Sequence, residues 1–214
     1  MQQMYLLLPP SEGKAQGGSG SWDHHSGRFA LAEQRSFVLD AVRTAPPRSS
    51  VPPTGGSLPA FERYTGVVWQ HLEPATLSAT ASRRARTQVL VASGLGGLFC
   101  WDDPVPSYKL KMAASTPQTG RLSKFWSRHL PSLLSDKPVI DLLALEQSAA
   151  LPVPGEHQGW WRVELVGPTG ERSGHNGKAA KGRLARALLS TDDPIDLLGN
   201  YEDLEGWSLK VQIR

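Results

Sequence analysis

The apolar runs of this chain are short, and prolines or glycines end them. Tyr5 to Leu8 reads YLLL and is followed by Pro9 and Pro10, while the run VLVA at 89–92 is followed by SGLGG. Short continuous apolar runs bounded in this way are typical of strands buried inside a sheet. None of them approaches the roughly 20 residues that a helix needs to cross a bilayer. We therefore expect an interior sheet and no membrane segment.

Strands and helices are predicted to share the rest of the sequence. The spacing of apolar residues predicts helices over 28–42, over 120–134 and from about Lys178 onward. Further strands are expected in KPVIDLLAL from Lys137, in GWWRVELVG from Gly159 and in the C-terminal WSLKVQIR. A chain of 214 residues suits one large domain that buries roughly 70% of its unfolded surface.

Two segments favour neither helix nor central strand. Residues 17–27 are rich in glycine and serine, and residues 44–59 read TAPPRSSVPPTGGSLP. The prolines of the second segment can neither propagate a helix nor pair inside a central strand. We therefore expect a single domain over residues 1–214, with mobile loops near 17–27 and 44–59.

Composition and charge exclude several classes of protein. Charged residues make up 20% of the chain without a long like-charge block, which is typical of a globular protein rather than a disordered one. A single cysteine, Cys100, allows no disulfide framework, and no signal peptide precedes the first strand, so a cytoplasmic location is expected. The histidines are scattered apart from His24 and His25 beside Asp23, so neither a metal site nor a cofactor is expected. The net charge of +3 suggests a polyanionic partner.

The residues after the first strand form the first candidate site. Ser11, Glu12, Gly13 and Lys14 lie at a sheet edge, where open sheets with parallel strands usually bind ligands. The loop is not a Walker A motif, because Lys14 is followed by Ala15 and no glycine stands five residues before Gly13. Lys14 suits an anion, and Glu12 suits an acid, a base or a partner for lysine. An ordinary solvated turn is the alternative interpretation.

The predicted helix from Lys178 has two unlike faces. At about 100° per residue its apolar side chains fall on one arc, and the cations Lys178, Lys181 and Arg186 fall on the opposite one. No acidic residue interrupts the cationic arc, whereas a solvated helix usually mixes both signs. The pattern favours a surface that faces an anion over a merely solvated face.

Five segments, taken in order, resemble the bacterial peroxide-stress family YaaA. The opening strand with LPPSEGK resembles the N-terminal signature of that family, and YTGVVW from Tyr64 resembles its Tyr-x-Gly block. SGLGGLFCWDDPVPSYKLKM from Ser93 is similar to its block Ser-Gly-Leu-Tyr-Gly…Asp…Pro-Tyr-Arg-Leu-Glu-Met. FW at Phe125 fits as well, and GKAAKGRLARAL from Gly177 is similar to the basic helix of the family.

The chain also departs from the family pattern. Gly96 replaces the tyrosine after Ser-Gly-Leu, Cys100 and Trp101 replace Arg-Pro, and Lys111 replaces a glutamate. The Leu-Ala-Ser…Glu-Tyr block is reduced to LLALEQ, in which Glu146 is retained. The chain therefore resembles a divergent member.

The resemblance implies a fold and a function. The fold is a single α/β domain with a mixed β-sheet flanked by helices and a positively charged cleft. The function is DNA binding, with a role in limiting oxidative damage when iron and peroxide are present. The helix-hairpin-helix element of the family cannot be located in this sequence.

The favoured hypothesis is a protein that binds DNA or a nucleotide-like anion, with Tyr64 or Trp101 stacking on a base or simply packing. An enzyme that acts on a nucleoside, a nucleotide or a similar anionic small molecule is the alternative. A third hypothesis is a regulatory domain whose basic face recognises an acidic protein. In the enzyme, the catalytic groups would be Glu12, Lys14 and Glu146. The residues expected to bind the anion or nucleic acid are Ser11, Lys14, Tyr64, Ser93, Tyr108, Lys109, Lys178, Lys181 and Arg186.

Overall fold

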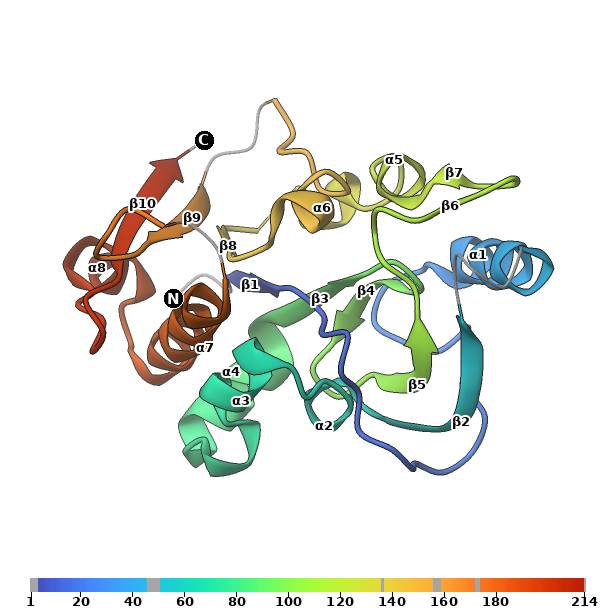
Figure 1. Cartoon of the computed structure of the whole chain (residues 1–214), viewed down its shortest axis with the longest axis horizontal. Coiled ribbons are helices and arrows are strands. Elements are labelled where there is room, and N and C mark those ends of the chain that lie inside the picture. The colour runs from blue at the N-terminus through green and yellow to red at the C-terminus, as the bar shows by residue number, and fades with distance from the viewer. Residues whose placement is uncertain (1–3, 46–50, 136, 156–158, 172–173, 214) are drawn as a thin grey trace.

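A computed structural model describes residues 4–45, 51–135, 137–155, 159–171 and 174–213 of the chain (Figure 1). In chain order its elements, with η for 3-10 helices, are β1 (Tyr5–Leu8), α1 (Ala32–Thr44), β2 (Val51–Pro59), α2 (Ala60–Arg63), α3 (Val67–Leu72), η1 (Pro74–Thr76), α4 (Ala79–Gln88), β3 (Val89–Ser93), β4 (Gly97–Cys100), β5 (Pro104–Lys109), β6 (Ser115–Thr116), β7 (Gly120–Arg121), α5 (Leu122–Trp126), η2 (Pro131–Leu134), β8 (Val139–Asp141), α6 (Leu145–Ser148), β9 (Trp160–Val166), α7 (His175–Ser190), α8 (Pro194–Asn200) and β10 (Ser208–Ile213).

The central sheet has six strands in the order β10-β9-β8-β1-β3-β4. β1 runs parallel to β3 and β8, and β9 runs parallel to β8, whereas β4 and β10 are antiparallel edge strands. Figure 1 shows α3, α4 and α7 on one side of this sheet and α5 and α6 on the other. The chain is therefore a single α/β domain with a mixed sheet flanked by helices, as the sequence predicted.

Two neighbouring inner strands of the sheet, β1 and β3, are buried on both faces. All side chains of β1 and β3 are buried, and Leu7 and Leu8 have 0% of their surface exposed. Burying each such leucine stabilises the fold by about 2 kcal/mol, which explains why these strands read as unbroken apolar runs. The strands expected from Lys137, from Gly159 and at the C-terminus are confirmed as β8, β9 and β10.

Two helices differ from the prediction. α1 begins at Ala32, four residues later than expected. The helix expected over 120–134 is limited to α5, because Gly120 and Arg121 belong to the β6-β7 hairpin. Further along, Pro131 begins a short 3-10 helix, since a proline inside an α-helix would remove a hydrogen bond and clash with the preceding turn.

The proline-rich segment was also predicted wrongly in part. Residues 51–59 form β2, which pairs with β5 in a separate two-stranded sheet rather than lying in a loop. The register shifts twice along this pair. Pro52 and Pro53 fall between paired positions, so the N–H groups that they lack are not needed for hydrogen bonds in the central sheet. Residues 46–50 of the expected loop lie outside the described residues.

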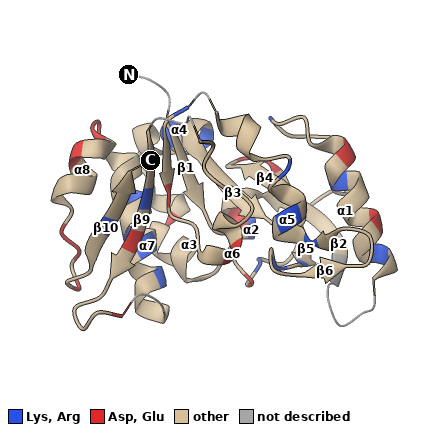
Figure 2. Ribbon diagram, turned by 90° about the horizontal axis from the view of Figure 1, so that it is seen from above, with Lys and Arg blue, Asp and Glu red and all other residues tan. Residues whose placement is uncertain are grey.

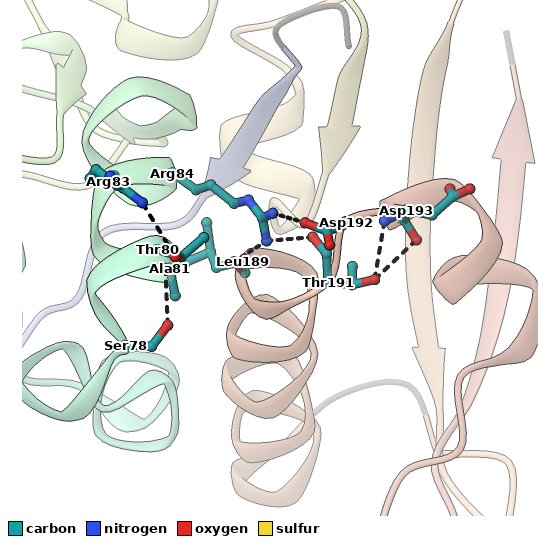
Figure 3. Close-up of polar contacts among 9 residues, drawn as sticks. All are labelled: Ser78, Thr80, Ala81, Arg83, Arg84, Leu189, Thr191, Asp192 and Asp193. Carbon is teal, nitrogen blue, oxygen red and sulfur yellow. Dashed lines mark hydrogen bonds and ion pairs between the residues drawn. The ribbon is translucent and has the colours of Figure 1, made fainter.

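Helix α7 is anchored at its C-terminal end to α4. The guanidinium of Arg84 donates to the carbonyl oxygens of Leu189 (3.2 Å) and Thr191 (2.6 Å) and pairs with Asp192 (Figure 3). These bonds satisfy carbonyls that the helix leaves unpaired at its end. Because α7 follows β9, which is parallel to β8, the N-terminal end of α7 lies toward the edge where the parallel strands end. None of the described helices combines the length and apolar character needed to cross a bilayer.

Candidate functional site

The loop after β1 folds into a tight turn at the carboxyl end of the parallel strands. The hydroxyl of Ser11 donates to the carbonyl of Gly13 and accepts the amide N–H of Thr65 at 3.1 Å. Lys14 forms an isolated antiparallel bridge with Tyr64. Gly66 must lack a side chain, because a Cβ there would lie 2.6 Å from the Cβ of Ser11. The Tyr-x-Gly segment thus holds the loop that carries Lys14.

The amine of Lys14 lies over two tyrosine rings. Its Nζ donates to the carbonyl of Ser11 at 2.9 Å, and it lies 4.2 Å from the ring centre of Tyr108 and 5.6 Å from that of Tyr64. Burial lowers the pKa of Lys14 to about 8, although the charge of Glu12 acts in the opposite direction. The loop therefore presents an amine that loses its proton more easily than an exposed lysine.

Three buried hydroxyls support these rings. Ser93 accepts the amide N–H groups of Leu95 (3.1 Å) and Gly96 (3.2 Å), so its own hydroxyl is left to donate to Tyr108 at 2.7 Å. The hydroxyl of Tyr108 is in turn hydrogen-bonded to the hydroxyl of Tyr64 at 2.9 Å. Burial raises the pKa of both tyrosines, which keeps them neutral. The three side chains were predicted to bind the ligand, and the structure places them beneath Lys14.

Ser93, Tyr64 and Tyr108 form a hydrogen-bonded group, which we call the cage, beside the Lys14 amine, and lysines from two further segments act on the neighbouring Glu12. Glu12 forms an ion pair with Lys111 at 2.7 Å, and that hydrogen bond, with smaller effects of Lys109 and Lys178, lowers the pKa of Glu12. Glu146 also acts on Lys111 and helps to raise the pKa of that lysine, after the contribution of Glu12. The early loop, the end of β5 and the start of α7 therefore share one electrostatic environment.

Lys181 extends the group toward β8. Its Nζ lies 3.5 Å from the carbonyl oxygen of Leu143, and burial lowers its pKa to about 8. Asp141 acts in the opposite direction, and Lys178 adds to the effect of burial. Asp141 itself is buried at the end of β8 and forms an ion pair with Arg162 at 3.0 Å. We call the set of Lys14, Lys109, Lys111, Lys178 and Lys181 the cationic edge. Elsewhere basic and acidic residues are mixed over the ribbon (Figure 2).

Arg186 is not part of the cationic edge. Its guanidinium donates to the carbonyl oxygens of Leu72 (2.9 Å), Glu73 (3.0 Å) and Thr76 (3.0 Å), where it caps the end of α3. α3 also packs directly against Gly182, which lies between Lys178 and Arg186 on the helix surface. The cationic arc of α7 is therefore partly a packing surface, and only Lys178 and Lys181 reach the sheet edge.

Other predicted residues have structural surroundings. Trp101 is 3% exposed and stacks on Phe61 with ring centres 5.3 Å apart. Its side chain is therefore part of the core and is not available to stack on a base. Cys100 is buried, and burial raises its pKa to about 12, so it does not provide a thiolate. Among the described residues, no three His, Cys, Asp or Glu side chains are grouped as a metal ion would require.

Sequence reasoning missed three residues of the site. Lys111 was noted as a cation close to Lys109 and as a departure from the family pattern but was not predicted to belong to the site, although it is the ion-pair partner of Glu12. Asp141 was not predicted as a site residue, although it stands alone inside an apolar run. A carboxylate in such a run indicates a cationic partner nearby, because a buried charge needs one. Arg63 donates to the carbonyl oxygens of Ala15, Gly17, Gly56 and Val105, and it gave no signal because only the fold brings these carbonyls together.

The lowered pKa values of Lys14 and Lys181 predict that stability rises with pH. Both lysines titrate at about 8 when folded, against 10.5 ordinarily, so between these values the unfolded chain binds more protons. The free energy of unfolding should therefore rise between about pH 8 and pH 10 by about 2 kcal/mol in total, since water screens these partly exposed groups. Above that range Tyr64 and Tyr108, whose pKa values are raised, reverse the trend.

Urea unfolding at several pH values measures this change. The Lys14→Met variant should show a smaller rise than the native chain, because one of the two titrating amines is gone. A free energy of unfolding that stays level or falls between pH 8 and pH 10 would contradict the assignment.

Comparison with known proteins shows what this chain is similar to. The sequence profile described as peroxide stress protein YaaA matches residues 29–211. A UPF0246 protein of Streptomyces coelicolor is 34% identical, over 98% of this chain and 93% of its own length. A UPF0246 protein of Corynebacterium efficiens is 28% identical over 98% of this chain and 95% of its own, and one of Corynebacterium glutamicum is 30% identical over 88% and 86%.

Proposed function

The chain belongs to the peroxide stress protein YaaA family, and from that premise we propose that it binds DNA through the cationic edge as part of protection against peroxide. The observation that carries the proposal is the effect of Lys109, Lys111 and Lys178 on the single carboxylate of Glu12. Three cations from two distant segments act on Glu12, and Glu146 also acts on Lys111, so three positive charges face two negative ones and leave positive charge for phosphates.

The chemistry of the edge agrees with a phosphate backbone. Lys109 and Lys178 are exposed, so their ammonium groups can exchange counterions for phosphates, and Lys111, also exposed, is held in an ion pair with Glu12. Lys14 and Lys181 are partly buried. Lys14 lies in the loop after β1, and Lys181 reaches the carbonyl oxygen of Leu143, just after β8. The edge therefore combines exposed outer cations with partly buried inner ones.

Salt dependence tests the proposal. Fluorescence anisotropy with a labelled duplex of about 20 base pairs, between about 50 and 300 mM salt, should give an affinity that falls steeply as salt rises. Replacing Lys109, Lys111 and Lys178 together by glutamine should reduce the slope of log K against log salt by about 2.7, which is about 0.9 for each phosphate contact.

Three other exposed cations provide the matched control. Replacing Arg43, Arg83 and Lys210 by glutamine removes the same charge from α1, α4 and β10. This control should change the slope far less than the edge variant. Equal slopes in both triple variants, or no binding at low salt, would refute the proposal.

Glu12 is expected to weaken DNA binding in the native chain. Its carboxylate holds Lys111 at 2.7 Å and would repel a phosphate at the same place. The Glu12→Gln variant should therefore bind the duplex roughly two- to fivefold more tightly at low salt, and the gain should shrink as salt rises. The same anisotropy titration measures the effect, and weaker binding by this variant would contradict it.

An enzyme acting on a nucleotide-like anion is the second candidate. It is favoured by the two lysines with a pKa of about 8, since Glu12 acts on Lys14 and Asp141 acts on Lys181. Glu146 acts on the same site through Lys111. Groups that titrate near neutral pH suit proton transfer. Calorimetric titration with nucleoside monophosphates separates the two candidates, since a nucleotide that binds tightly to a chain without affinity for duplex would favour the enzyme.

A further inference from the structure

We propose that the amine of Lys14 is a nucleophile that forms a covalent imine with the ring-opened sugar aldehyde of an abasic site in DNA. The inference rests on the proposed DNA binding and adds a covalent reaction to it. It starts from the place of Lys14, which differs from that of the other lysines of the cationic edge.

The first observation is that the Lys14 amine is held in place with few polar partners. Its one described hydrogen bond is to the carbonyl of Ser11 at 2.9 Å, and an aromatic face lies 4.2 Å away. Glu12, which is close enough to act on its charge, forms its ion pair with Lys111 instead. The ammonium form of Lys14 therefore lacks the carboxylate partner that a buried charge needs.

The second observation is that this cage is rigid. Tyr108 is fixed from behind by Ser93 at 2.7 Å and by Tyr64 at 2.9 Å, and Ser93 is fixed by two backbone amides. The rings therefore cannot turn away to let water surround the amine. With a pKa of about 8, roughly one Lys14 amine in ten is neutral at pH 7, against about one in three thousand for an ordinary lysine.

The third observation concerns access. Lys14 is half-buried rather than enclosed, and its neighbours Glu12 and Gly13 are exposed. Lys109, Lys111 and Lys178 surround the same loop with exposed positive charge. A substrate that reacts with the Lys14 amine therefore needs an electrophilic carbon, and the surrounding lysines favour one with negative charge close to that carbon.

An abasic deoxyribose combines these two properties. Its ring-opened form has an aldehyde at C1′, and phosphates flank the sugar on both sides. The neutral amine donates its electron pair to C1′, and the carbonyl oxygen takes up a proton to give a carbinolamine. Loss of water then gives the protonated imine, so that one amine, one aldehyde and one proton yield one iminium and one water. No oxidant or reductant takes part.

Reductive trapping tests the inference on the full chain. A labelled duplex with one central abasic site is incubated with the protein and sodium borohydride, which reduces an imine to a stable amine bond. We expect a covalent complex with this duplex and none with the intact duplex. Digestion and mass spectrometry of the native adduct should locate it on Lys14, and adducts located on Lys181 or spread over several lysines would overturn the inference.

Lys14→Arg separates charge from nucleophilicity. A guanidinium keeps the positive charge but stays protonated, so at a duplex concentration that saturates both proteins the variant should lose about a hundredfold of the adduct. Lys210→Arg, a change on the remote strand β10, should leave the adduct unchanged. If intact duplex binds but no adduct forms, the inference fails and the proposed function stands. If the chain neither binds duplex nor forms an adduct, the proposed function and the inference both fail. If Lys14→Arg does not fold, the lysine to which the adduct maps in the native chain tests the inference.

Discussion

Replacing Arg63 by leucine is expected to lower the free energy of unfolding by about 3–5 kcal/mol, because buried carbonyls lose a charged donor. The side chain of Arg63 is fully buried and donates to the carbonyl oxygens of Val105 (2.9 Å), Gly17 (3.1 Å), Gly56 and Ala15. These oxygens belong to β5, to β2 and to the segment just after Lys14, so one guanidinium joins three parts of the chain.

The same change should disturb the cationic edge. Ala15 follows Lys14 directly, and its carbonyl would lose its bond to Arg63. Without that bond the lysine is less firmly held over Tyr108, so the variant should lose both stability and any imine trapping. Arg63→Lys should restore little, because one ammonium cannot reproduce the planar fork that reaches several carbonyls.

Urea unfolding at neutral pH measures the loss. Arg83→Leu is the matched control, since Arg83 is an exposed arginine on α4 whose described hydrogen bond is a long one to Thr80, 3.4 Å (Figure 3). Its change in unfolding free energy should stay within about 0.5 kcal/mol. A loss below about 1 kcal/mol for Arg63→Leu would show that the carbonyls find other donors.

The parts of the fold that follow from local pattern were predictable. The buried run of β1, the prolines that end it and the alternation of β9 each depend on residues close in sequence, and their interpretation is confirmed. β2 was missed because proline was judged against a central sheet, whereas this strand pairs with β5 in a separate two-stranded sheet. Pattern alone does not reveal which sheet a strand joins.

The candidate site was predictable in location but not in detail. The loop after β1 and the start of α7 were chosen for their lysines, and both lie at the cationic edge. The aromatic cage under Lys14 was not predictable, because Tyr64, Ser93 and Tyr108 come from three segments whose hydroxyls meet only in the fold. Arg186 was misjudged for a similar reason, since the carbonyls it caps belong to a distant helix.

Gly182 connects the packing of α7 to the cationic edge, and Gly182→Ala is expected to lower the free energy of unfolding by about 2 kcal/mol. A Cβ at this position would collide with the carbonyl oxygen of Val68, and it would lie 2.8 Å from the Cβ of His71 and 3.0 Å from the amide nitrogen of Leu72. Backbone atoms of α3 cannot move aside, so the two helices must separate. Lys178, one turn earlier on α7, would move with the helix and weaken duplex binding.

Gly199→Ala provides the control that isolates this contact. Both glycines are helical, and alanine favours a helix over glycine by about 1 kcal/mol, so propensity alone predicts that both changes stabilise the chain. An added Cβ at Gly199 meets nothing within 4 Å, and a gain of about 0.5 kcal/mol is expected at this position near the helix end. Changes of opposite sign in urea unfolding, with a loss of duplex affinity only for Gly182→Ala, are the expected result. A gain in stability at both glycines would mean that α3 and α7 do not pack as closely as the structure has them, and that Lys178 is not held at the edge by this contact.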